Sequence, residues 1–175
     1  MIDLVYVSVS EQQLAVITGQ IGREPKGLIK VAVANPEGVP LVLQMRSLLD
    51  DVPFPTLYWL SSKDLCKAIG QIEGKGWVKE IESRLQADAE LRDAYLQNQK
   101  DYVARRWDLM LAEDKARIEA LGFTEMFTRY GIGGISQWDK VRCLHMQYAH
   151  HLAEGNVIGA LMDQEFELNL RRYSQ

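Results

Sequence analysis

Cysteine and histidine, the two residue types with the widest range of chemistry near neutral pH, gather in one segment near the end of the chain. Cys143 and His145 are separated by one residue, and His150 and His151 follow closely. A histidine can serve as a general base, a proton switch or a ligand group, and a cysteine thiolate can serve as a nucleophile. We therefore take His145 and Cys143 as the candidate catalytic residues.

The spacing of apolar residues from Gln137 to Glu154 predicts one amphipathic helix, ended by Gly155. At about 100° per residue, His145 falls within its apolar stripe, and Cys143 points about 200° away from His145. Side chains that diverge so far on a straight helix cannot hold one ion, and helical ligand pairs normally have i, i+3 or i, i+4 spacing. The pattern predicts no metal and no other cofactor, a mostly buried His145 and a partly accessible Cys143.

Both candidates also have a structural interpretation. The ring nitrogens of a core histidine are commonly satisfied by backbone groups or a carboxylate. A cysteine inside a helix lacks the helix N-terminus that lowers the pKa of a thiol, although Lys140 and Arg142 are near in sequence. Both interpretations stay open from the residues alone.

A glycine-rich loop precedes this helix. Its glycines let backbone amides approach a ligand, and the start of a helix favours an anion. The spacing is that of neither a Walker loop nor a Rossmann fingerprint, and an ordinary capped turn is the alternative. We expect a small phosphate or carboxylate to bind here, with positive charge from the residues that follow. The residues expected to bind it are Gly131, Gly133, Gly134, Lys140, Arg142 and Tyr58.

The N-terminal third contains the strand patterns. Residues 30–34 and 41–45 read as two strands around the turn 35–38, and residues 56–60 as a third strand with two apolar faces. Ser10 and Gln13 form a capping box that begins a helix, and residues 2–9 are either a strand or an unwound lead-in.

Helical patterns fill the remainder, including a long helix that Asp88 can cap. Early strands and late helices predict an α+β fold. We expect a small, mainly antiparallel sheet of about three or four strands from the N-terminal third, packed against a predominantly helical C-terminal two-thirds. Without repeats or a linker, residues 1–175 are expected to form a single domain.

Four stretches of the chain together resemble one bacterial family, which is catalogued as domain of unknown function 501. The stretches are Gln20–Pro25, Pro53–Leu60, Ile72–Leu85, and Gly131–Gly134 with the Lys140–His145 and Leu152–Asn156 segments. The resemblance implies a fold but no reaction.

Relatives in that family often carry an arginine–cysteine pair after the first strand and a cysteine after the tyrosine-containing strand. Ala34, Asn35 and Ser62 stand at those places here, and only Cys143 is retained. If those relatives use several cysteines for a metal or redox centre, this chain cannot do so in the same way.

The composition of the chain narrows the classes of partner and the compartment that we expect. The chain has 20 basic and 24 acidic residues and a net charge of -4, which argues against a nucleic-acid partner. Two cysteines fit a reducing compartment, the N-terminus does not resemble a secretory signal, and no apolar run approaches the ~20 residues that span a bilayer. We expect a cytoplasmic protein that is not embedded in a membrane.

Two functions are consistent with these patterns. One is a domain that binds a small anionic or phosphate-containing ligand, with or without catalysis. The other is a non-enzymatic interaction or oligomerisation domain, for example a homodimer, which uses the long helix over residues 88–111. That helix carries Tyr95, Tyr102, Trp107 and Met110. These are more large apolar side chains than one buried helix face requires, and such a surplus can mark an interface.

Overall fold

A computed structural model describes residues 9–170. The strands are β1 (Leu28–Ala34), β2 (Pro40–Met45), β3 (Leu48–Leu49), β4 (Val52–Pro53) and β5 (Tyr58–Leu60). The α-helices are α1 (Glu11–Ile21), α2 (Lys63–Gly74), α3 (Trp77–Ala87), α4 (Ala89–Leu109), α5 (Ala112–Ala120), α6 (Thr124–Arg129), α7 (Leu144–Glu154) and α8 (Val157–Phe166). Two short 3-10 turns, η1 (Ile132–Gly134) and η2 (Leu168–Leu170), complete the order.

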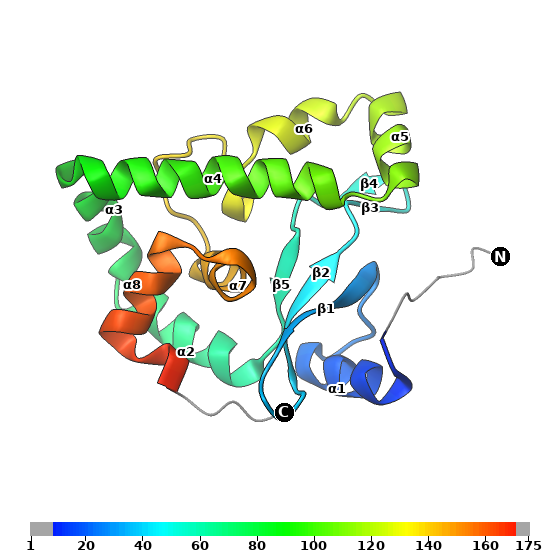
Figure 1. The fold of residues 1–175 in the computed structure, drawn as a ribbon, viewed down its shortest axis with the longest axis horizontal. Helices are drawn as coiled ribbons and strands as arrows, with labels where there is room; N and C mark the ends of the chain where they lie inside the picture. Colours follow the sequence, from blue (N-terminus) through cyan, green and yellow to red (C-terminus); the bar gives the residue numbers. More distant parts are fainter. Residues whose placement is uncertain (1–8, 171–175) are drawn as a thin grey trace.

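The main sheet has β2 at its centre, with β1 and β5 antiparallel on either side. Every residue of β2 is buried because both faces of the sheet are covered. Figure 1 shows α1 on one side of this sheet and α7 on the other. Leu43 and Trp59 face the α1 side, whereas Val42 and Leu60 join the larger core beneath α7.

The α+β prediction is confirmed, with the sheet in the N-terminal part and helices packed against it. The capping box at Ser10 and the side-chain cap at Asp88 are present as the sequence predicts, and Ser62 caps α2 by the same local rule. The short β3–β4 hairpin is not among the predicted strands. Its two-residue turn, Asp50 and Asp51, adopts positive φ angles of 50° and 62°. The alternatives for residues 2–8 lie outside the described residues.

The last predicted helix is wrong at its start, because α7 begins at Leu144 rather than Gln137. The preceding segment is held in a non-helical path by distant groups. The Tyr95 hydroxyl donates to the Lys140 carbonyl at 2.9 Å, and the Val141 amide donates to Glu82 Oε1 at 3.0 Å. Apolar residues of this segment reach the core without forming a helix. The spacing of apolar residues alone does not distinguish a helix from such a non-helical segment.

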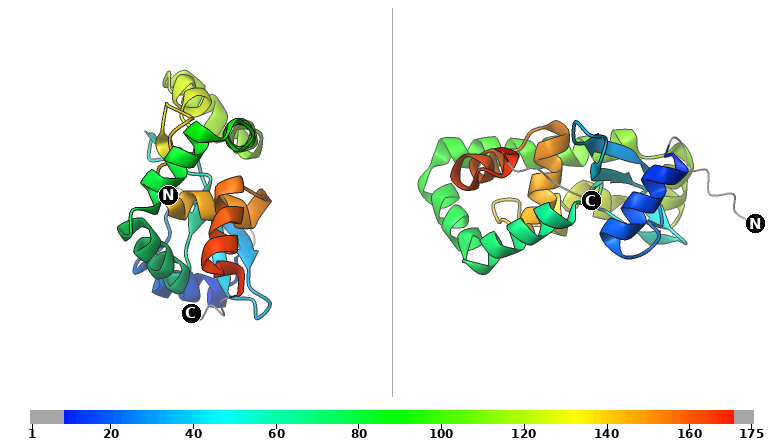
Figure 2. Two further views of the ribbon diagram at one scale, coloured as in Figure 1. Left: turned by 90° about the vertical axis from the view of Figure 1, so that its left-hand side faces the viewer. Right: turned by 90° about the horizontal axis from the view of Figure 1, so that it is seen from below.

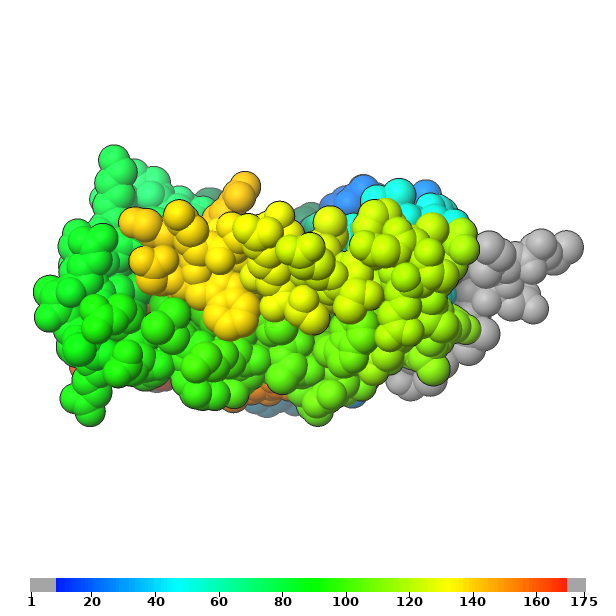
Figure 3. Space-filling view, turned by 90° about the horizontal axis from the view of Figure 1, so that it is seen from above, coloured from blue at the N-terminus to red at the C-terminus, as the bar shows by residue number. Residues whose placement is uncertain are grey.

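The long helix α4 packs inward rather than presenting an apolar face. Figure 3 shows the segment that follows α5 lying along α4. Tyr95 and Tyr102 are fully buried, and Trp107 packs in a cluster with Met110. The surplus apolar bulk that suggested an interaction surface is therefore accounted for within the chain. Homodimerisation stays a prediction, but the apolar residues of α4 no longer support it. No helix within residues 9–170 has both the length and the apolar character required to cross a bilayer.

Arg106 of α4 is a fully buried cation that joins three segments. Its guanidinium donates to the carbonyl oxygens of Pro55, Phe127 and Tyr130 at 2.9, 2.5 and 2.7 Å. It also lies 5.4 Å from the ring centroid of Tyr102. Burial lowers the pKa of Arg106, but the carbonyl dipoles and the aromatic ring solvate the charge. Arg106 therefore ties the entrance of β5 to the end of α6.

Replacement of Arg106 by leucine should lower the free energy of unfolding by at least about 3 kcal/mol, because one buried and two partly buried carbonyls lose their donor. Arg105→Leu is the matched control, since the adjacent Arg105 is half exposed and forms one surface ion pair with Glu154. Urea unfolding of both variants measures the difference. Equal losses would show that the buried carbonyl contacts contribute little.

Candidate functional site

Cys143 lies immediately before the first residue of α7. Its backbone is in the left-handed region, with φ 55° and ψ 89°, where a non-glycine residue costs on the order of 1–3 kcal/mol. Its carbonyl accepts hydrogen bonds from the amides of Met146 and Gln147, so the helix starts directly from it. The half-buried thiol is thus placed at the positive end of the helix dipole.

His145 is fixed by a hydrogen bond to a neighbouring helix. Its Nε2 is 3.0 Å from the carbonyl oxygen of Cys66 in α2, and because a carbonyl only accepts, Nε2 carries the hydrogen. The other ring nitrogen, Nδ1, lies 3.5 Å from Glu73 Oε1. The pKa of His145 is raised to about 9, chiefly by its hydrogen bond with the Cys143 side chain, with the Cys66 carbonyl and Glu73 adding to the effect against burial.

Glu73 comes from the last turn of α2. The buried face of that helix, which includes Ile69 and Ile72, packs in the main core and directs Glu73 toward the start of α7. Its Oε1 accepts the backbone N–H of Leu144 at 2.8 Å. One carboxylate therefore caps α7 and faces the imidazole of His145 at the same time.

The structure brings Glu73, Cys143 and His145 together, with their candidate ligand atoms all within 4.8 Å of one another. Ligands of one zinc ion, bound at about 2.0–2.3 Å, lie roughly 3.5 Å apart, so small side-chain rotations would suffice. The argument that Cys143 and His145 diverge is wrong, because Cys143 is outside the helix and its backbone turns the thiol back toward the ring. With 27% of its side chain exposed, His145 is mostly buried, and Cys143 is partly accessible, as the sequence predicts.

The glycine loop differs from the expected anion cradle. The amides of Gly131 and Gly134 donate within the loop, to Ile135 and Gly131 carbonyls, and the Ile132 amide donates to Gln99 Oε1 at 2.7 Å. No α-helix starts directly after the loop, because α7 begins only at Leu144, so the expected helix dipole is missing there. Three of the loop amides are therefore engaged, and the late start of α7 removes the helix dipole from this loop.

A shallow depression of about 620 Å³ does lie beside this loop. Gly134, Lys140 and Arg142 line it, and Lys140 Nζ is 3.9 Å from Glu82. Tyr58 is elsewhere, since its hydroxyl donates to Glu154 at the far end of α7. Gly133 has a packing role, because a Cβ there would lie 2.6 Å from the Arg142 carbonyl oxygen.

The comparison with known families agrees with the resemblance seen in the sequence. Residues 31–164 match the model of a family described as protein of unknown function (DUF501). The chain belongs to the DUF501 family. Its matched region includes Glu73, Cys143 and His145. No curated protein and no solved structure gives a significant match.

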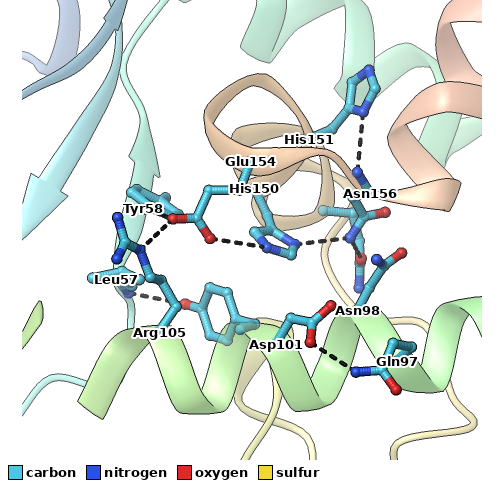
Figure 4. Close-up of polar contacts among 12 residues, drawn as sticks. Leu57, Tyr58, Gln97, Asn98, Asp101, Arg105, His150, His151, Glu154 and Asn156 are labelled. Atoms are coloured by element: carbon cyan, nitrogen blue, oxygen red, sulfur yellow. Dashed lines mark hydrogen bonds and ion pairs between the residues drawn. The ribbon is translucent and has the colours of Figure 1, made fainter. Parts of the chain in front are cut away.

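A second polar group of this DUF501 chain surrounds His150, which is 1% exposed (Figure 4). The ring stacks against Tyr58, with centroids 6.4 Å apart, and meets the Tyr102 ring edge-on at 5.3 Å. Its Nδ1 is 3.2 Å from Asn156 Nδ2, and its Nε2 is 3.8 Å from Glu154 Oε2. Burial lowers the pKa of His150 to about 4, although Glu154 opposes the effect. The group connects α7 to α4 and β5.

Stability should fall in mild acid because of His150. The unfolded histidine takes up a proton below pH 6.5, whereas the folded one resists protonation until about pH 4. The free energy of unfolding should therefore decrease as the pH falls from 6.5 to 4, by on the order of 2–3 kcal/mol from this residue. Urea unfolding at pH 7 and pH 4.5 should show that His150→Gln loses much of this dependence. An unchanged dependence in the variant would assign the acid sensitivity to other groups.

Proposed function

We propose that this protein binds a zinc-type divalent metal ion through Cys143, His145 and Glu73, leaving one coordination position open to solvent. The approach of the three ligand atoms to within 4.8 Å carries the proposal. Thiolate, imidazole and carboxylate are the ligand types that zinc takes in proteins. One thiolate and one carboxylate would together balance the charge of the ion.

Hydrogen bonds that orient the proposed ligands also support a metal site. Metal-binding histidines usually donate their second ring N–H to a carbonyl or carboxylate, which orients the ring. The Nε2 contact of His145 with the Cys66 carbonyl has this form and leaves Nδ1 facing Cys143 and Glu73. The Leu144 amide orients the Glu73 carboxylate in a similar way. A metal ion would take the place of the proton on Nδ1.

The number of ligands indicates the kind of site. Three protein ligands and an open fourth position are typical of zinc sites that do chemistry, whereas structural sites use four protein ligands. All three residues are half-buried, so solvent or a substrate could reach the ion. A water bound there would have its pKa lowered to about 7 and could act as a nucleophile at neutral pH.

Elemental analysis of protein purified without chelators should find about one zinc per chain. His145→Ala and Cys143→Ser should lose the metal, because each removes one of only three ligands. Cys66→Ser is the matched control and should keep it, since only the backbone carbonyl of Cys66 contacts the site. Circular dichroism melts would verify that each variant is folded. Wild-type protein without bound zinc after exposure to excess zinc and dialysis would refute the proposal, as would zinc retained by both variants.

A second candidate function is anion binding in the depression beside the glycine loop. The cationic side chains of Lys140 and Arg142 line it, although the amides of Gly131, Ile132 and Gly134 are already engaged. Arg142 is exposed and directly precedes Cys143, so an anion held there would sit beside the proposed metal site.

Thermal melts with phosphate, sulfate and carboxylates test this second candidate. At a hundredfold excess over Kd, a bound anion should stabilise the protein by about 2.7 kcal/mol. Arg142→Ala combined with Lys140→Ala should remove the shift, whereas Lys100→Ala on α4 should not. Gly133→Val is unsuitable because its side chain would collide with the Arg142 backbone at a position with φ 75°. A shift that survives in the double variant would rule out this depression.

A further inference from the structure

A separate apolar hollow lies on the face of the sheet that α1 covers. It is bounded by the end of α1, by β2, by the β3–β4 hairpin and by the lead-in to β5. The space between these elements measures about 510 Å³, part of which is open to solvent. Its apolar walls are formed by Ile21, Leu43, Met45, Leu49, Phe54 and Trp59.

Local contacts fix the side chains that line the hollow. Phe54 and Trp59, which both line the hollow, stack with ring centroids 5.8 Å apart and an interplanar angle of 16°, so each ring orients the other. Gly27, with φ 75°, lets Leu49 approach so closely that a Cβ would lie 2.3 Å from Leu49 Cδ2. Ile21 and the two aromatic side chains are only half-buried, although they belong to or pack against the core of this face.

Two cations, Arg23 and Lys26, also line the hollow, and both are exposed. Within residues 9–170, neither forms an ion pair or a side-chain hydrogen bond. In contrast, Arg46 on the neighbouring strand connection is bound by Asp114 and Glu113. The hollow thus combines an apolar interior with unneutralised positive charge, in a protein whose net charge is -4.

From this combination we infer that the hollow binds a small aromatic carboxylate. The ring would lie against the wall formed by Phe54 and Trp59, and the carboxylate would lie between Arg23 and Lys26. Aromatic stacking and charge-assisted hydrogen bonds supply the affinity. This site is formed by other residues than the proposed metal site, so the inference does not rest on the proposed function.

A pair of matched probes, 2-naphthoate and its uncharged amide 2-naphthamide, separates the charge from the ring. Titration of the full chain, followed by calorimetry and by backbone amide shifts in NMR spectra, should show naphthoate binding at least about tenfold more tightly than the amide. The amide shifts should map to the ends of α1 and β2. Glu73→Gln should leave both affinities unchanged.

Variants test each half of the hollow. Arg23→Gln with Lys26→Gln should weaken naphthoate about tenfold and leave naphthamide unchanged, because only the carboxylate contacts the cations. Ile21→Trp should weaken both probes by filling the hollow at a half-exposed position, and Lys100→Gln should affect neither. The inference fails if naphthoate does not bind, if acid and amide bind equally, or if naphthoate binding survives the charge variant. The charge variant alters only exposed side chains, so a folding failure of Ile21→Trp would not leave the inference untested.

Discussion

The left-handed backbone of Cys143 is the constraint on which the proposed site depends. It breaks the chain direction just before α7, so that the thiol turns toward the helix it precedes. The carboxylate of Glu73 accepts the Leu144 amide and so caps the first turn from another helix. This unfavourable backbone conformation is maintained because the partners of α7 fix its position, a pattern often associated with functional sites.

Buried polar groups as well as apolar contacts hold α7 in place, and Figure 2 shows it enclosed among the other helices and the sheet. Tyr95 of α4 accepts hydrogen bonds from Gln99 and Gln147 and donates to the Lys140 carbonyl. Gln147 in turn accepts from Asn156. Such satisfied networks have few alternative arrangements, because each lost partner leaves a buried group unpaired. The network therefore fixes the segment that leads into Cys143.

Sequence patterns predicted the parts of the fold that depend on neighbouring residues. Caps at Ser10, Ser62 and Asp88 and the turn between β1 and β2 follow local rules, and each is present. The start of α7 depends on contacts with residues distant in sequence, such as Glu82, so periodicity could not place it. Glu73 was missed as a site residue for the same reason. It looks like one more charge on an amphipathic helix until the fold brings it beside His145.

Cobalt substitution tests most directly whether Cys143, His145 and Glu73 converge on one ion. A cobalt(II) ion bound there should show a sulfur-to-metal charge-transfer band, together with the intense visible bands of tetrahedral coordination. The charge-transfer band should disappear in Cys143→Ser and persist in Cys66→Ser, and Glu73→Gln should alter the visible bands. A wild-type spectrum without the charge-transfer band, or with one that depends on Cys66, would contradict the account.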